Sequence, residues 1–257
     1  MRKWIAVLFV VALLSGTASI VQAAQIIALH SGDTNPTTEG WTREPGSVSI
    51  VEGPVANDAG FGGLSAWNIN DNSTAGGSTL IYTTTTTASQ MDNAAEFGWI
   101  LSMRVRVVDT PDAVDYSVYG GYSTTAAALD RRFLIQLGSD SAGDPIVRLE
   151  GLSATTLTGL GNGYHLYELI YDPDAGSADL FVDGVETISN YTGAANPLNF
   201  ARVGWGGAQS DTIGSGNYNL VSFAILIPEP STMALLGFGV VGLAVLRPNR
   251  SSRWRVS

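Results

Sequence analysis

The feature that most constrains the fold of this chain is a repeated alternation of apolar and polar residues in short segments. In residues 99–108, the apolar positions are Trp99, Leu101, Met103, Val105 and Val107, and the polar positions between them include Ser102, Arg104 and Arg106. A period of two is typical of a β-strand with one buried face and one face in water. Residues 116–122, 132–137 and 145–150 repeat the pattern, with turn residues between them, and residues 164–171 are rich in aromatic and branched residues. This spacing predicts antiparallel strands and an all-β fold class.

One segment has the features of a short helix instead. Residues 89–97 follow a threonine-rich strand, and Ser89 offers a hydroxyl that can cap the first turn. Asp92 lies near the start of the segment, where a negative charge is favourable. The sequence therefore predicts one helix among the strands.

The most informative hairpin begins at residue 164. Its strands flank a turn at residues 172–176, and Asp183-Gly184 then supplies the two positive-φ positions of a type I′ turn. The segment Leu180-Phe181-Val182-Asp183-Gly184 resembles a strand and turn of the concanavalin A-like lectins and glucanases, the laminin-G-like members in particular. The resemblance covers residues 99–226. It implies an antiparallel two-sheet jelly-roll sandwich, concanavalin A-like, whose final strand pairs beside the first.

The N-terminal end has the three parts of a secretory signal peptide. Met1-Arg2-Lys3 is basic, residues 4–14 are apolar, and Val21-Gln22-Ala23 offers small residues for cleavage. We expect residues 1–24 to be a signal helix that directs export through the Sec machinery. The chain contains no cysteine, so the exported domain does without disulfides. Residues 25–227 are long enough for one β-sandwich domain with its own core.

The C-terminal end also has three parts, in residues 228–255. Pro228-Glu229-Pro230 cannot continue a helix, because neither proline has an N–H to donate. An apolar block follows at residues 233–246, equivalent to about 20 Å of helix. The chain then carries Arg247, Arg250, Arg253 and Arg255, which favour a cytoplasmic location for that end.

This order of motif, short transmembrane helix and basic tail resembles the PEP-CTERM sorting signal of Gram-negative bacteria. The resemblance implies that an exosortase recognises Pro228, Glu229 and Pro230 and processes the chain while the helix holds it in the inner membrane, with Arg247 and Arg250 in the basic tail. The mature protein would then reach the cell surface or the extracellular matrix. The alternative is an ordinary C-terminal membrane anchor.

The charge of the middle segment excludes one class of function. The whole chain has a net charge of −10, and its lysine and several of its arginines lie in the two targeting ends. The cations left in the middle are Arg43, Arg104, Arg106, Arg131, Arg132, Arg148 and Arg202. A strongly acidic domain is unsuited to nucleic acid, which is bound by neutralising phosphates.

The sequence offers little for catalysis. Glucanases of the resembled family carry their carboxylates as Glu-x-Asp-x-x-Glu on a strand, whereas Asp179, Asp183 and Glu186 have the wrong spacing. His30 and His165 are the only histidines, which is too few for a convincing triad or zinc site. We expect His165 to be a core residue and the domain to be no enzyme, with a glycoside hydrolase as the least favoured reading.

Two hypotheses remain for the middle domain. In the first, it binds carbohydrate, namely the exopolysaccharide of a biofilm matrix, through exposed aromatic rings. The candidates lie near predicted loops or glycine-rich turns and are Trp41, Trp67, Tyr122, Tyr191 and Trp205. The alternative for each ring is a place in the core, where most sandwich tryptophans lie. In the second hypothesis, the domain is a structural matrix protein without a defined ligand.

A loop near the start of the domain is a candidate calcium site. Asp33, Asn35 and Glu39 bring oxygen donors within a few residues of each other, and calcium prefers oxygen ligands. The same residue types also build ordinary turns. No cofactor is required by either hypothesis.

Overall fold

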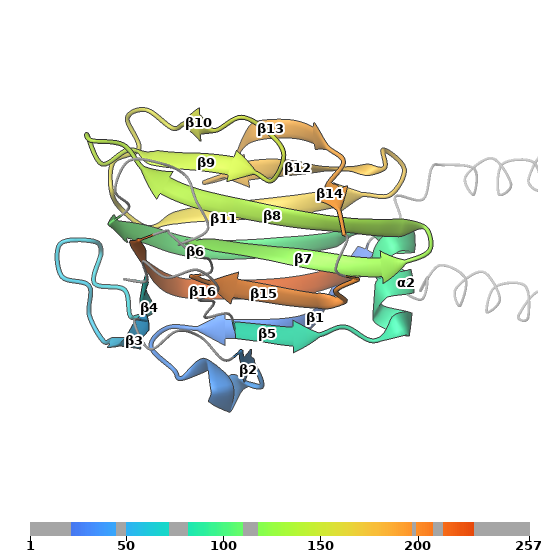
Figure 1. The fold of residues 1–257 in the computed structure, drawn as a ribbon, viewed down its shortest axis with the longest axis horizontal. Coiled ribbons are helices and arrows are strands. Elements are labelled where there is room, and N and C mark those ends of the chain that lie inside the picture. Colours follow the sequence, from blue (N-terminus) through green and yellow to red (C-terminus); the bar gives the residue numbers. More distant parts are fainter. Residues whose placement is uncertain are drawn as a thin grey trace, which may run out of the picture. The chain divides into compact units, whose positions relative to one another are not determined.

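Two antiparallel β-sheets packed face to face make up the body of the protein (Figure 1). The computed structural model describes residues 22–44, 50–71, 82–109, 118–196, 199–207 and 213–228. Residues 24–226 form one compact unit. The all-β two-sheet sandwich predicted from the alternating segments is confirmed.

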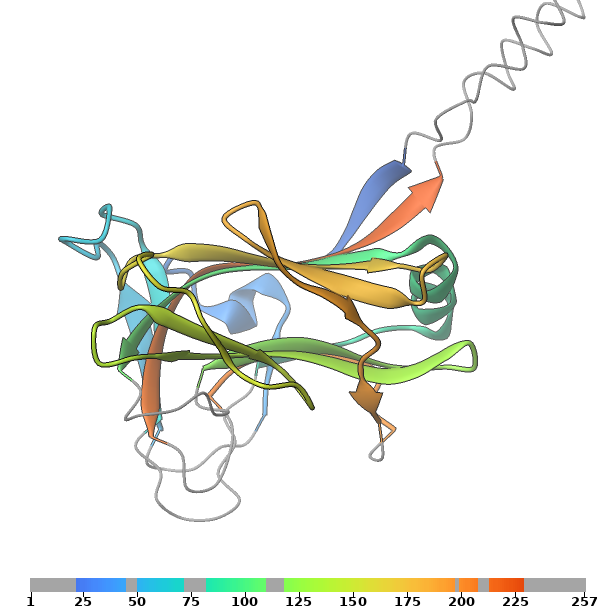
Figure 2. The ribbon, with the colours of Figure 1, turned by 90° about the horizontal axis from the view of Figure 1, so that it is seen from above.

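The first sheet, sheet A, contains the longest strand. Its order is β13 (Val185–Tyr191), β12 (Ser177–Val182), β11 (His165–Asp172), β6 (Trp99–Asp109), β16 (Gly214–Pro228), β4 (Ala66–Asp71) and β3 (Ile50–Val55), and β1 (Gln22–Ser31) also pairs with β16. The pairing of β1 with β16 confirms the expectation that the final strand lies beside the first. These two strands run side by side in Figure 2.

The second sheet, sheet B, covers the inner face of sheet A. Its order is β10 (Thr155–Thr156), β9 (Pro145–Leu149), β8 (Leu129–Ser139), β7 (Tyr119–Ala126), β15 (Arg202–Gly206), β5 (Tyr82–Thr85) and β2 (Thr42–Arg43), and β14 (Ala194–Ala195) pairs with β8. A short 3-10 helix, η1 (Pro36–Glu39), and one α-helix, α2 (Ala88–Phe97), complete the described elements.

The core lies between the sheets, where the alternation of β6 places its apolar residues. Trp99, Leu101, Met103 and Val105 are fully buried. The ring centroid of Trp99 lies 5.0 Å from that of Phe133 in β8, so one side chain ties the two sheets together. Figure 2 shows the layers edge on.

Helix α2 confirms the predicted helix, but its cap is a different residue. The hydroxyl of Thr87 accepts a hydrogen bond from the backbone N–H of Gln90, and the Gln90 side chain accepts one from the Thr87 N–H. This reciprocal pair is a capping box. Ser89 therefore lies inside the helix, and the prediction that it is the cap is wrong.

The β12–β13 hairpin has the turn that the sequence predicts. Asp183 and Gly184 have φ angles of 50° and 80°, as a type I′ turn requires.

The two targeting segments fall largely outside the described ranges. None of the helices within those ranges has the length and apolar character that crossing a bilayer requires. The predicted signal helix, the apolar block at residues 233–246, and Glu229, Pro230, Arg247 and Arg250 lie outside the described residues. Pro228 is the last residue of β16.

Candidate functional site

The five aromatic residues predicted to be carbohydrate platforms are all buried. Their exposed fractions run from 0% to 7%, and the residues are Trp41, Trp67, Tyr122, Tyr191 and Trp205. A ring without an open face cannot stack on a sugar, so the prediction that these rings are exposed is wrong. Each of the five rings is part of the core, which was the alternative interpretation.

The packing around Trp205 explains its burial. Two glycines flank it in β15, and the strand points its ring toward the core. The ring stacks on His30 at 4.7 Å and packs against Tyr82 at 5.0 Å and edge-on against Trp41 at 5.8 Å. Large rings fill the space between two sheets that lie about 10 Å apart.

The candidate calcium ligands have structural partners. Asn35 caps η1 by accepting hydrogen bonds from the N–H and the hydroxyl of Thr37, at 3.0 and 2.8 Å. Glu39 pairs with His30 Nδ1 at 2.6 Å and accepts a hydrogen bond from the Ser31 N–H at 3.1 Å. Asp33 lies in the turn before η1. Calcium binding here stays a prediction.

Among the described residues, only a few aromatic side chains are partly exposed. They are Phe61, Phe97, Tyr164, Phe181 and Phe200. Two of them, Phe61 and Tyr164, meet at one cluster of polar side chains on the outer face of sheet A. We therefore take that cluster as the candidate site.

Four polar side chains form a row across adjacent strands of sheet A, which we call the polar row. Asn217 of β16 is in register with Asn68 of β4 on one side and with Arg106 of β6 on the other. Tyr164 directly precedes β11, the strand beyond β6. The neighbouring residues Ile69, Val105 and Tyr218 are buried in the core, so alternation places the polar row on the outer face.

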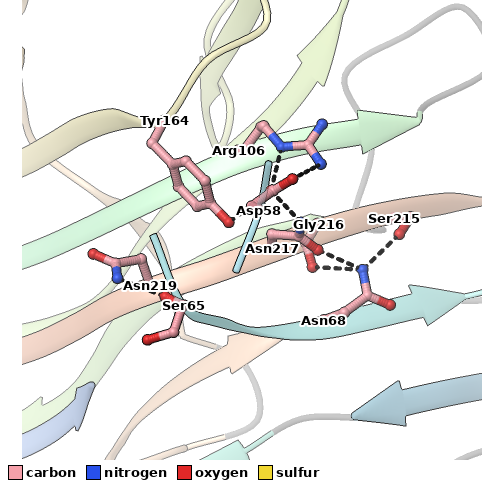
Figure 3. Close-up of polar contacts among 9 residues, drawn as sticks. All are labelled: Asp58, Ser65, Asn68, Arg106, Tyr164, Ser215, Gly216, Asn217 and Asn219. Atoms are coloured by element: carbon pink, nitrogen blue, oxygen red, sulfur yellow. Dashed lines mark hydrogen bonds and ion pairs between the residues drawn. The ribbon is translucent and has the colours of Figure 1, made fainter. Parts of the chain in front are cut away.

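Asp58 lies at the centre of the polar row (Figure 3). Its carboxylate accepts hydrogen bonds from Arg106 Nε at 2.8 Å and Nη2 at 3.1 Å. It also accepts from the Tyr164 hydroxyl at 2.9 Å and from Asn217 Nδ2 at 2.8 Å. Only 8% of Asp58 is exposed. Four donors on one buried carboxylate fix the orientation of three of the four row residues.

These contacts also determine the electrostatics of the site. Burial alone would raise the pKa of Asp58, but the hydrogen bonds from Arg106, Asn217 and Tyr164 outweigh it and hold the pKa below its ordinary value of 3.8. Burial and the adjacent Asp58 carboxylate both raise the pKa of the Tyr164 hydroxyl. Asp58 is therefore ionised and Tyr164 neutral at physiological pH.

Residues 56–65 form the loop that carries Asp58 to the sheet. The Asp58 N–H donates to the Leu64 carbonyl at 3.0 Å, and the Asp58 carbonyl accepts from Phe61 N at 3.0 Å. At the far end of the loop, Asn219 Nδ2 donates to the Ser65 carbonyl at 2.7 Å. The Phe61 ring lies 3.9 Å from the Arg106 guanidinium carbon, a cation–π contact. The loop thus brings both an acid and an aromatic ring to the polar row.

Sequence reasoning missed Asp58 and the row around it. Alternation had placed Arg104 and Arg106 on a wet face, which is a usable signal. The residues that surround Arg106 come from loop 56–65, from β4 and from β16. They lie close together only because of the register between the strands of sheet A.

His165, Asp179 and Asp183, which were weighed for catalysis, have structural contacts, and Glu186 is exposed on β13. His165 is buried, as predicted, with Nδ1 2.7 Å from Asp183 Oδ2 and Nε2 3.1 Å from the Gly161 carbonyl. Asp183 also accepts from the Leu166 N–H at 2.9 Å. Asp179 accepts from the Asn190 N–H at 2.7 Å. These groups hold the hairpins of β11, β12 and β13.

The C-terminal stretch matches a known family description. Residues 226–250 match the PEP-CTERM protein-sorting motif. The chain carries this sorting signal. The motif implies an exported protein that is held transiently in the membrane and processed by an exosortase. The predicted sorting residues Pro228, Glu229, Pro230, Arg247 and Arg250 all lie within the matched range.

The sandwich is similar to solved structures in fold alone. A carbohydrate esterase from the Shiga toxin-encoding bacteriophage phi24B is 14% identical with a TM-score of 0.56, covering 79% of this chain and 99% of that chain. A protein of unknown function from Shewanella oneidensis MR-1 is 12% identical with a TM-score of 0.50, covering 85% of this chain and 93% of that chain. None of the curated proteins matches the chain.

Proposed function

We propose that this exported protein belongs to the cell surface or extracellular matrix of a Gram-negative bacterium and that its sandwich binds carbohydrate without catalysing a reaction. The ligand class is a matrix exopolysaccharide. The observation that carries the proposal is the polar row around Asp58, which joins amide, guanidinium and phenol groups to two partly exposed aromatic rings on one sheet face.

The chemistry of the polar row suits sugar hydroxyls. Asn68 is partly exposed, and its amide has both a donor and an acceptor group, as a sugar hydroxyl has. Asn217 is only 3% exposed, and its amide already donates to Asp58 and accepts from Asn68, so it holds these two side chains in place. Phe61 adds an apolar face for the ring of a sugar. Because Asp58 already holds Arg106, Tyr164 and Asn217 in place, binding costs little ordering of side chains.

The same contacts support binding over catalysis. A general acid needs a carboxyl group that is protonated near the working pH. The pKa of Asp58 is lowered, and its oxygens accept four hydrogen bonds within the protein. We assign Asp58 the role of a positioning residue.

A structural matrix protein without a ligand is the second candidate. The observation that favours it is that the buried Asp58 carboxylate already accepts four hydrogen bonds from within the domain. On that reading, the network serves only to hold loop 56–65 on sheet A.

Affinity electrophoresis separates the two candidates. The full-length protein in mild detergent would be run in gels that contain dextran, xylan or hydroxyethylcellulose, each with calcium or with a chelator. We expect retardation by at least one polymer and its loss in Phe61→Ala and Asn68→Ala. Retardation that requires calcium would support a calcium site in the loop of Asp33, Asn35 and Glu39.

Phe200→Ala is the matched control. Its ring is also partly exposed and lies 3.8 Å from the guanidinium carbon of Arg202, but away from the polar row. It should migrate like the unmodified protein. If no polymer retards the unmodified protein, the structural reading replaces the binding reading.

A further inference from the structure

Besides Phe61 and Tyr164, another aromatic ring lies on the same face of sheet A, on β12. Phe181 alternates with Leu180 and Val182, which are buried in the core, so its side chain is on the outer face. The ring is partly exposed. It is in register with Glu168 of β11 on one side and Glu186 of β13 on the other.

Paired residues of adjacent strands have their side chains on the same face, so the two glutamates flank the Phe181 ring. With strands about 4.8 Å apart, the backbones of Glu168 and Glu186 are about 10 Å apart. Glu168 accepts a hydrogen bond from the Ser102 hydroxyl at 3.2 Å, and Glu186 is exposed. The result is an apolar ring with a carboxylate at each edge, able to accept hydrogen bonds from the hydroxyls of a stacked sugar.

The sheet surface is continuous between this ring and the polar row. Ser102 and Arg106 are both at outward positions of β6, four residues apart, which is about 13 Å along the strand. Between them, Arg104 is in register with Leu166, and both are partly exposed. A ligand can therefore lie on the face from one aromatic site to the other.

The charges on the face discriminate between polymers. Neither Glu168 nor Glu186 takes part in any ion pair of the described residues. Arg106 is neutralised by Asp58. Arg104, also on this face, is in none of the ion pairs among the described residues and donates to Asn219 Oδ1. At the Phe181 ring the two glutamates outnumber this one arginine, so an acidic polymer would meet net repulsion, whereas a neutral polymer brings hydroxyl donors.

We propose that Phe181, Glu168 and Glu186 form a second subsite of the carbohydrate surface, and that the occupant is a neutral polysaccharide segment long enough to reach from Phe61 to Phe181. This inference rests on the proposed function. It adds that the ligand must be long enough to contact both rings and that it is uncharged.

Chain length tests the proposal in the full-length protein. Oligosaccharides of two and six residues, prepared from dextran, xylan or hydroxyethylcellulose, would compete for retardation in the matching gel. We expect the hexamer to compete at about tenfold lower concentration than the dimer. Phe181→Ala should remove that advantage and weaken retardation by about fivefold, while Phe181→Tyr, which keeps an aromatic ring, should restore both.

Two further measurements separate the possible failures. Alginate, an acidic polymer, should not retard the unmodified protein, whereas Glu186→Arg, at an exposed position, should gain retardation by alginate. Retardation that Phe61→Ala abolishes but Phe181→Ala leaves intact would overturn the second subsite and keep the first. Stronger retardation by alginate than by neutral polymers would overturn the proposal that the ligand is neutral. Absence of retardation by every polymer would overturn the proposed function itself.

Discussion

At the scale of single residues, Asp58 is the side chain on which the polar row depends. Its substitution by asparagine removes the charge that faces Arg106 and replaces an acceptor with a donor. Breaking a buried ion pair costs about 3 kcal/mol, and the side chains of Asp58 and Arg106 are only 9% and 11% exposed. We expect Asp58→Asn to lower the free energy of unfolding at pH 7 by about 2–3 kcal/mol.

Urea denaturation measures this change, and Asp92→Asn is its control. Asp92 is exposed on α2, so its substitution should change the free energy of unfolding by less than about 0.5 kcal/mol. Equal stability of the two variants would contradict the role assigned to Asp58.

The effect of Asp58 should also depend on pH. Because the pKa in the folded protein is below the ordinary value of 3.8, the folded state favours the ionised carboxylate more than the unfolded state does. The stabilisation is therefore complete above pH 3.8 and is lost as pH falls through the lowered pKa. The stability gap between the unmodified protein and Asp58→Asn should be constant from pH 5 to 7 and narrow below about pH 3.8. If the difference in the free energy of unfolding stayed the same below pH 3.8, the lowered pKa of Asp58 would not contribute to stability.

Single residues also mark where the sequence misleads. Trp205 lies next to two glycines, and Trp41 follows a turn-rich loop, so both rings were candidates for an exposed position. Composition near a ring cannot say which way its strand faces, because that depends on the register with the neighbouring strands. In β6, where a full alternating pattern was available, the buried and wet faces were assigned correctly.

At the scale of elements, the start of α2 shows how local signals compete. Thr87 and Ser89 both carry hydroxyls that can cap a helix, and Asp92 favoured the later start. Gln90 decides between them, since only a cap at Thr87 places Gln90 three residues on, where the reciprocal bond of a capping box forms.

This choice predicts different costs for two similar substitutions. Thr87→Ala removes the cap and should lower the free energy of unfolding by about 1 kcal/mol. Ser89→Ala removes a hydroxyl within the first turn and should change it by less than about 0.5 kcal/mol. Thermal and urea unfolding of the pair provide the comparison. A larger cost for Ser89→Ala would restore the original assignment of the cap.

At the scale of the whole molecule, the sequence predicts the strands but does not predict the polar row. A strand such as β6 or β9 has its own alternating pattern, so its existence is local information. The polar row is long-range, because Asp58 and Arg106 are separated by 48 residues and Asp58 and Asn217 by 159. Only after β16 pairs with both β4 and β6 do these side chains share one face.

The sorting signal, in contrast, is contiguous, and its recognition needed no fold. Pro228 ends β16, so the strand stops where the matched motif reaches its prolines. Replacing Pro228 and Pro230 by alanine removes the rigid, donor-free backbone that marks the site. We expect the double variant to stay unprocessed in the inner membrane, detected as the precursor mass in the membrane fraction.

Pro54→Ala/Pro173→Ala is the control, because it removes the same number of prolines from the sandwich and leaves the motif intact. It should be processed like the unmodified protein. The mass of the mature protein in culture fluid or on cells then gives both cut sites. If the motif variant is cut and released as efficiently as the control, the exosortase does not recognise the two prolines, and recognition must lie in Glu229, in the apolar block or in the arginines that follow it.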